Sequence, residues 1–339
     1  MPIEKWVSKE ELERHLHSDE KLPSAIPYVT SYYKKDWGFC ISHQQRENIL
    51  NGKKFFVKID TELKAGSLTW AHAYLQGRSK KEFIFSTYVC HPSLANNELS
   101  GPLVAIFLLE QLRKQKNLNY SYRFIFAPET VGTINFIHSN LAGLRENLFG
   151  GLVLTCIGDS GKYTYKKTFS GCNLIDRMME EFLENKGPNE VNAALDFFPW
   201  GSDERQYNSP GLRLPVGCLS RTIYGKYPEY HTSLDNKSVL NFDKISQTVD
   251  DLLKLILDFE NTWFPVQKDG RCEPKLDKYG LYKTTSQTRI NSERTNAIRW
   301  CLSLADGQHS LGMIAKRSGL EIQIIEEVAK ELSRKGLLL

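Results

Sequence analysis

Two histidines and two acidic residues stand at positions of the sequence where side chains commonly carry chemistry. His91 and Glu129 each follow an apolar run that predicts a buried strand, and a helix-like stretch comes after each of them. Because ligands gather at the carboxyl ends of strands in open α/β sheets, we expect both side chains at one sheet edge. Asp203 and His231 lie in two later polar loops. Two histidines and an aspartate that leave a position to water form a catalytic type of zinc site, and a nearby glutamate can take the proton of that water.

The elements that must position these residues alternate between strands and helices. Apolar runs predict strands over 83–91, 122–127 and 151–156. Helical stretches follow over 99–114, 130–139, 173–185 and 243–263. This alternation predicts an α/β core over residues 79–265.

The rest of the chain divides into four further segments. Residues 1–27 form an N-terminal segment with a short helix that begins at Ser8. Short aromatic and β-branched runs between turns predict a small all-β subdomain over 28–78. Residues 266–291 are polar and rich in turns, which indicates a linker. Three short helices over 292–339 have the spacing of a winged-helix domain.

Composition and charge narrow the class of protein. The 339 residues carry a net charge of +4, spread along the chain, so a surface for polyanions is not expected. Seven widely spaced cysteines without a CxxC pair favour a reducing cytoplasm over a disulfide framework. No segment predicts secretion or membrane spanning. The helix over 321–331 carries four acidic residues and one lysine, so we expect the winged helix to contact protein and not nucleic acid.

Other nucleophiles and purely structural roles are the alternatives to a metal site. The chain has no Gly-x-Ser-x-Gly elbow for a serine nucleophile. Cys90 precedes His91, but neighbours along a strand point to opposite faces, so we do not expect a thiol and imidazole pair. A single histidine such as His91 is more often structural than a ligand, and Asp203 could cap a turn.

Six segments, taken in order, resemble a known family. They are residues 25–33, 37–40, 90–96, 128–130, 202–207 and 227–233. The chain resembles the aminopeptidase-like proteins of bacterial polysaccharide-biosynthesis gene clusters over nearly its whole length. The resemblance implies the zinc-exopeptidase fold, with a mixed sheet, flanking helices, a small inserted β subdomain and a C-terminal winged helix. It implies Zn²⁺ held by His91, Asp203 and His231, with Glu129 as the general base.

Two departures from the family's pattern change the expected metal content. Asn97 stands where the family has an aspartate that bridges two metal ions, and Thr130 follows Glu129 where the wider clan commonly has a ligand glutamate. We therefore expect one ion or none. The family also tends to carry an earlier N-terminal section that completes the core, so another chain could supply that section.

Two functions of different classes remain open. The first is a metal-dependent hydrolase of the aminopeptidase type that cleaves an amide bond of a small peptide or aminoacyl metabolite, with polysaccharide biosynthesis as its setting. Polar and aromatic side chains would shape its substrate pocket: Asn97, Glu204, Arg205, Tyr224 and Tyr230. The second is a catalytically inactive binding or assembly protein that meets a protein partner, or a second copy, through the winged helix. Neither predicts a nucleic acid or a membrane as a partner.

Overall fold

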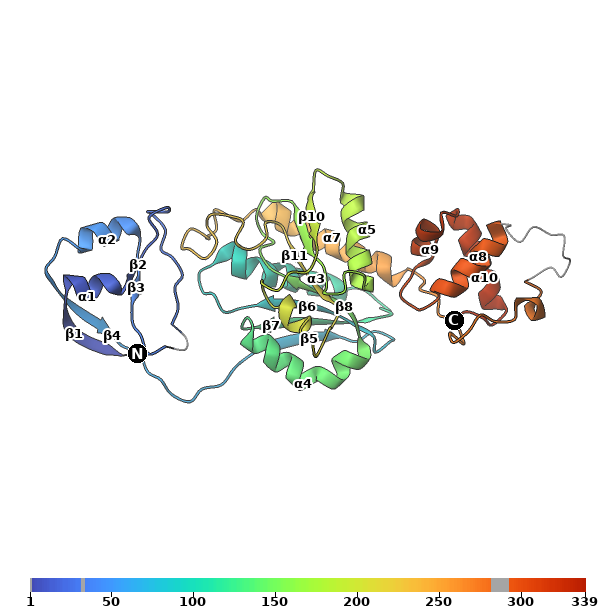
Figure 1. Cartoon of the computed structure of the whole chain (residues 1–339), viewed down its shortest axis with the longest axis horizontal. Coiled ribbons are helices and arrows are strands. Elements are labelled where there is room, and N and C mark those ends of the chain that lie inside the picture. Colours follow the sequence, from blue (N-terminus) through green and yellow to red (C-terminus); the bar gives the residue numbers. More distant parts are fainter. Residues whose placement is uncertain (1, 32–33, 282–292) are drawn as a thin grey trace. The chain divides into compact units, whose positions relative to one another are not determined.

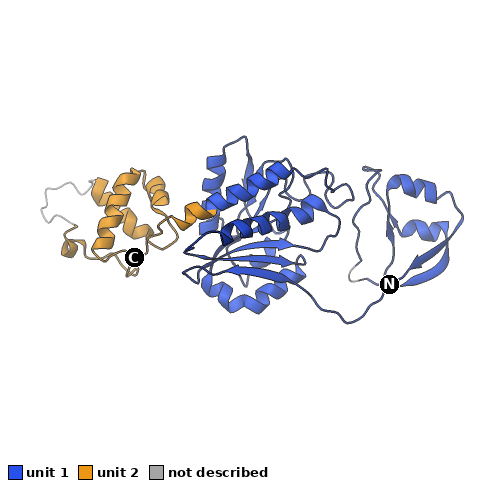
Figure 2. Ribbon diagram, turned by 180° about the vertical axis from the view of Figure 1, so that it is seen from behind, with its two compact units in different colours: residues 1–255 blue, residues 256–339 orange. Residues whose placement is uncertain are grey.

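The computed structural model describes residues 2–31, 34–281 and 293–339. Two compact units divide the chain, residues 1–255 and 256–339, and Figure 2 shows them in different colours. None of the helices in these described residues has the length and apolar character needed to cross a bilayer.

A seven-stranded mixed sheet forms the centre of the first unit, with the strand order β10-β9-β11-β8-β6-β7-β5. The strands are β5 (Ala71–Leu75), β6 (Glu82–Tyr88), β7 (Ser121–Ala127), β8 (Leu148–Leu154), β9 (Tyr163–Lys166), β10 (Val191–Leu195) and β11 (Val216–Ser220). β6 runs parallel to both of its neighbours, β7 and β8. All seven residues of β6 are buried, as expected for a strand covered on both faces.

Helices cover the sheet, with α3 and α4 on opposite faces (Figure 1). The helices of this unit's core are η1 (Ala95–Leu99, a π-helix), α3 (Ser100–Arg113), α4 (Val131–Asn147), α5 (Leu174–Lys186), α6 (Glu204–Tyr207) and α7 (Phe242–Glu260). Buried apolar residues of α4, such as Phe136, pack with Ile84 of β6 and Val153 of β8. The predicted α/β core is thereby confirmed, although α4 extends well beyond the predicted 130–139 and β9, β10 and β11 were not predicted.

A small subdomain precedes the core and is mixed, where the sequence predicted an all-β unit. β1 (Ile3–Ser8) pairs with β4 (Lys54–Ile59), and β2 (Leu16–His17) pairs with β3 (Phe39–Cys40). Two helices, α1 (Lys9–Arg14) and α2 (His43–Ile49), accompany these strands.

The boundary at 27/28 was wrong, because the β1–β4 pairing joins the two segments on either side of it. A cluster of Val7, Leu12, Leu16 and Val57 forms the core that they share. The end of the subdomain at 78 was wrong as well, because β5 pairs with β7 in the central sheet.

The second unit contains α8 (Glu293–Leu304), α9 (Leu311–Ser318) and α10 (Ile322–Arg334) around one apolar cluster. The linker prediction fails for residues 266–281, because this segment packs with the helices. Isolated β-bridges pair Val266 with Asp306 and Gln267 with Leu338. Leu276, in the short helix η2 (Leu276–Tyr279), is buried in the apolar cluster. The remainder of that predicted linker, from 282 onward, lies outside the described residues, as do Tyr32 and Tyr33 of the first family-like segment.

Candidate metal centre

His91 and Glu129 meet where two parallel strands end. β6 ends at Tyr88 and β7 at Ala127, so the turns that follow lie at the same sheet edge. His91 Nε2 lies 3.8 Å from Glu129 Oε2. On the other side of the ring, Nδ1 lies 2.9 Å from Glu98 Oε2. A carboxylate bonded to one ring nitrogen fixes the tautomer and aims the other nitrogen, as in many metal sites.

The protonation of these two groups follows from their surroundings. Burial disfavours the charged form of His91, but hydrogen bonds with Cys90 and Glu98 outweigh burial and raise its pKa to about 10. Burial raises the pKa of Glu129, although Ser202, His91 and Arg205 oppose that rise. A metal ion at Nε2 would therefore have to displace a proton.

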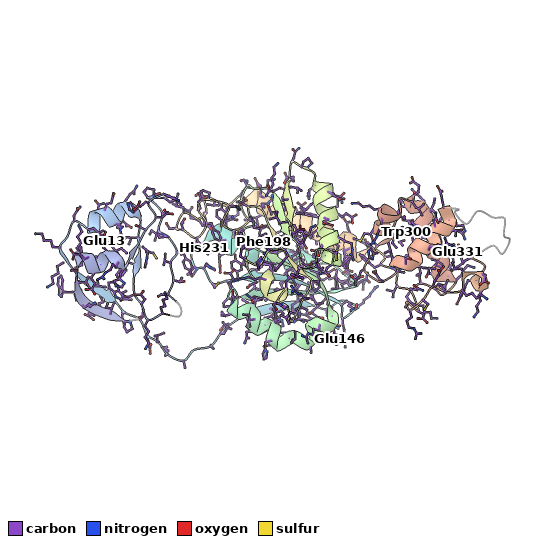
Figure 3. All side chains as sticks on the ribbon, viewed as in Figure 1. Glu13, Glu146, Phe198, His231, Trp300 and Glu331 are labelled. Carbon is purple, nitrogen blue, oxygen red and sulfur yellow. The ribbon has the colours of Figure 1, made fainter. Side chains whose placement is uncertain are left out.

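His231 brings a second imidazole to this edge from a loop of the core (Figure 3). Its ring centroid lies 5.2 Å from that of His91, and its ring stacks on Tyr230 at 4.0 Å. Burial lowers the pKa of His231 to about 4, so its ring is neutral at pH 7 and keeps a lone pair for a ligand. The structure thus brings together three of the four predicted residues.

Asp203 has a different environment from the one expected of a ligand. It is fully buried; Oδ1 accepts the Thr130 amide at 2.7 Å and Oδ2 accepts the Thr133 hydroxyl at 2.8 Å. Thr130 has a φ of 64°, a strained conformation for a non-glycine residue. Asp203 therefore holds the first turn of α4. Its role as a ligand stays a prediction.

Cys90 contacts His91, contrary to the expectation from strand alternation. Its Sγ lies 3.2 Å from His91 Nδ1 and accepts the Glu129 amide at 3.2 Å. The alternation argument was wrong here, because β6 ends at Tyr88 and both residues lie in the turn beyond it. Cys90, His91 and Glu129 form a group whose ligand atoms lie within 4.8 Å of one another.

Three of the predicted substrate-binding residues lie near this group. Asn97 is buried and donates through Nδ2 to the Tyr88 hydroxyl at 2.7 Å. Arg205 is exposed and reaches the Thr130 hydroxyl at 3.4 Å. Tyr230 is half-buried against His231. Contact of these side chains with a substrate stays a prediction.

The other two, Glu204 and Tyr224, belong to a buried ion cluster. Lys166 Nζ donates to Glu204 Oε1 at 2.8 Å and contacts the Tyr224 hydroxyl at 3.2 Å, and it lies over the Phe198 ring that Figure 3 labels. The side chains of Lys166 and Glu204 have no exposed surface. This burial disfavours direct contact with a substrate.

Several residues of the site were missed from the sequence. Asp235 accepts the amides of Asn96 and Asn97 at 2.6 and 2.9 Å, and thereby holds the turn that carries Glu98. The Tyr28 ring lies 5.2 Å from that of His91. Tyr28 lies inside the family-like segment 25–33, and Asp235 lies two residues after the segment 227–233. These positions are the signal in the sequence that could have identified both residues.

The donor set fits a divalent ion of the zinc type. Sulfur, imidazole and carboxylate are its usual ligands. Two buried oxygens beside the group, Asn97 Oδ1 and Glu98 Oε1, have no hydrogen-bond partner among the described residues. Such atoms are rare in native proteins and indicate a missing ion or water.

Comparison with known proteins agrees with this fold. The family described as a domain of unknown function (DUF4910) matches residues 19–262, and a winged helix-turn-helix family matches 263–339. A Clostridium acetobutylicum protein named "Putative polysaccharide biosynthesis protein with aminopeptidase-like domain" is 40% identical over 338 residues, which cover 100% of this chain and 76% of that protein.

Solved structures extend the comparison. A crystal structure named for a "putative peptidase" from Clostridium acetobutylicum has a TM-score of 0.77 and 39% identity, covering 100% of this chain and 76% of that one. BSAP, described as a zinc aminopeptidase from Bacillus subtilis, has a TM-score of 0.53 at 15% identity, with 76% and 65% covered, and shares the fold. The chain belongs to the aminopeptidase-like family that these matches define, with a C-terminal winged helix.

Proposed function

We propose that this chain is a metal-dependent hydrolase of the aminopeptidase type, which cleaves an amide bond of a small peptide or aminoacyl metabolite. The observation that supports it most is the pair of His91 Nε2 and Glu129 Oε2, 3.8 Å apart, with Glu98 aiming the ring. His231 adds the second imidazole, and Asp203 holds the turn after Glu129.

The chemistry follows from these residues. A bound zinc-type ion would supply Lewis acidity to a carbonyl oxygen and a more acidic water. Glu129 takes the proton of the attacking water and returns it to the leaving amine, and its raised pKa suits both transfers. Arg205, which lowers the pKa of Glu129, keeps a positive charge beside the site. Its exposed guanidinium would attract an anionic part of the substrate.

The printed names of two similar proteins support the choice of zinc and of the substrate class. The Bacillus subtilis neighbour is described as a zinc aminopeptidase, which favours zinc for this site. The name of the Clostridium relative places it in polysaccharide biosynthesis, which favours an aminoacyl or peptidyl group on a sugar as the substrate.

A specific observation favours a second candidate, a catalytically inactive binding or assembly protein. Thr130 offers no carboxylate at the position after Glu129, and both oxygens of Asp203 already accept hydrogen bonds from Thr130 and Thr133. A site with fewer ligands would hold its ion weakly.

Glu129→Gln tests the hydrolase. The amide cannot act as a base, so we expect hydrolysis of aminoacyl amides to fall by about a hundredfold or more while bound zinc is unchanged. Glu146→Gln, at an exposed position of the helix that follows the base, is the matched control and should keep full activity. If a zinc-loaded wild-type protein hydrolyses none of a broad panel of aminoacyl and peptidyl amides, the binding protein is the better account.

A further inference from the structure

We infer that the Cys90 thiolate is a ligand of the metal ion, so that a sulfur donor joins the imidazole nitrogens of the site. This inference rests on the proposed metal dependence and adds a donor that the two-histidine and aspartate set does not contain. It also supplies an anionic ligand besides Asp203, whose oxygens accept hydrogen bonds from Thr130 and Thr133.

The positions of three side chains carry the inference. One ligand atom from each of Cys90, His91 and Glu129 lies within 4.8 Å of the others. The ligands of one tetrahedral zinc ion lie about 3 to 4 Å apart, given bonds of about 2.0 to 2.3 Å. Rotation of these side chains would bring Cys90 Sγ and an imidazole nitrogen of His91 to one ion, with Glu129, the proposed base, beside it.

The backbone around Cys90 suits a bound thiolate. The Glu129 amide donates to Sγ at 3.2 Å, and hydrogen bonds from outer partners stabilise and orient ligands in metal sites. Cys90 is half-buried, so an ion can reach its sulfur. The buried oxygens Asn97 Oδ1 and Glu98 Oε1, which lack partners among the described residues, lie on residues of the same site, and a missing ion or water would satisfy them.

Among the described residues, Cys90 is the cysteine whose sulfur is grouped with His91 and Glu129. Cys156, Cys218 and Cys301 are buried, and Cys172 and Cys272 are exposed. Cys40 has the same half-buried character as Cys90, but it lies in the small subdomain and contacts the Val29 carbonyl. Cys40 is therefore a matched control.

A sulfur donor changes which ions the site prefers. Thiolate ligands favour zinc, and its spectroscopic substitute cobalt, over magnesium or calcium. Sulfur bound to Co²⁺ also gives a near-ultraviolet charge-transfer band, which nitrogen and oxygen donors do not give.

The test is titration of the metal-free full chain with Co²⁺, followed by absorption spectroscopy. We expect visible cobalt absorption together with the near-ultraviolet sulfur band in the wild-type protein and in Cys40→Ser, and loss of that band in Cys90→Ser. Zinc affinity in Cys90→Ser, measured by competition with a chromophoric chelator, should fall by more than the roughly tenfold to hundredfold that loss of an outer partner costs.

The possible results separate the two proposals. Visible cobalt absorption without the sulfur band in the wild type overturns the sulfur ligand and leaves the hydrolase intact. A sulfur band that persists in Cys90→Ser also overturns it. Absence of any cobalt or zinc binding overturns both the sulfur ligand and the metal dependence. If Cys90→Ser does not fold, Cys90→Ala takes its place, with the same expected loss of the sulfur band.

Discussion

At the scale of single residues, the environment of each side chain separates site residues from structural ones better than its type does. The sequence singled out His91, Glu129 and His231, and the structure brings them together at one sheet edge. The type and spacing of residues cannot show which side-chain atoms already have a hydrogen-bond or ion-pair partner in the fold. Asp203 and Glu204 therefore looked like available carboxylates, although one holds α4 and the other pairs with Lys166.

Glu98→Ala should weaken metal binding without removing a proposed ligand. The Glu98 carboxylate bonds His91 Nδ1 and so aims Nε2. Loss of such an outer partner costs about tenfold to a hundredfold in metal affinity. Competition titration with zinc measures this, and Glu98→Gln, which keeps an acceptor oxygen, should lose less. Unchanged affinity in the alanine variant would show that Glu98 does not orient the ring.

Asp203→Asn should change how stability depends on pH. Burial raises the pKa of Asp203 to about 7, above its ordinary value near 3.8. Between these values the folded state holds a proton that the unfolded state has lost, so this residue makes stability fall as pH rises from about 4 to 7. Asparagine does not titrate; its Oδ1 can accept the Thr130 amide and its Nδ2 can donate to the Thr133 hydroxyl. Urea unfolding of the metal-free protein at several pH values should show that the unfolding free energy falls less between about pH 4 and pH 7 in the variant than in the wild type. An identical fall in both proteins would contradict the raised pKa of Asp203.

At the scale of elements, the long and strongly patterned segments were predictable and the short ones were not. The bounds of α3, α5 and α7 fall close to the predicted ones. β9 has four residues and β11 five, too few for a clear period, and tertiary pairing decides them. The same limit misplaced β5, whose partner β7 is distant in the sequence.

Asp235→Ala should destabilise the fold through the π-helix η1. The carboxylate accepts the amides of Asn96 and Asn97 and the Tyr227 hydroxyl. Its removal leaves buried donors unpaired, which costs about 2 to 4 kcal/mol of unfolding free energy. Chemical denaturation measures this cost. Asp159→Ala is a control beside the same turn, since Asp159 accepts from the Asn96 side chain, and it should cost less. Equal costs would show that Asp235 has no special role.

At the scale of the whole molecule, an aminopeptidase-like unit and a winged helix are joined in one chain. The resemblance predicted this combination, but the limits of the second unit could not be read from composition. Its apolar cluster includes Leu276, from a segment that is polar and rich in turns, and only pairing with the helices reveals that membership.

The winged helix should not bind nucleic acid. α10 carries Glu326, Glu327 and Glu331, and its Lys330 lies 3.6 Å from Glu326. Phosphates would be repelled from this helix. Fluorescence anisotropy of the full chain with duplex DNA at low salt should give no binding with a dissociation constant of about 10⁻⁴ M or tighter. That value is the weak end of the usual range for non-specific binding. Salt-dependent binding in the micromolar range would contradict this reading of α10.

The central claim, a metal centre at the carboxyl edge of the sheet, is tested most directly by the metal content of the protein. Elemental mass spectrometry of the wild-type chain, offered zinc and then freed of excess ion, should give about one zinc per chain, and a His91→Ala and His231→Ala double variant that keeps the wild-type circular dichroism should give almost none. A wild-type protein that acquires no metal, or a double variant that keeps the full amount, would contradict the account.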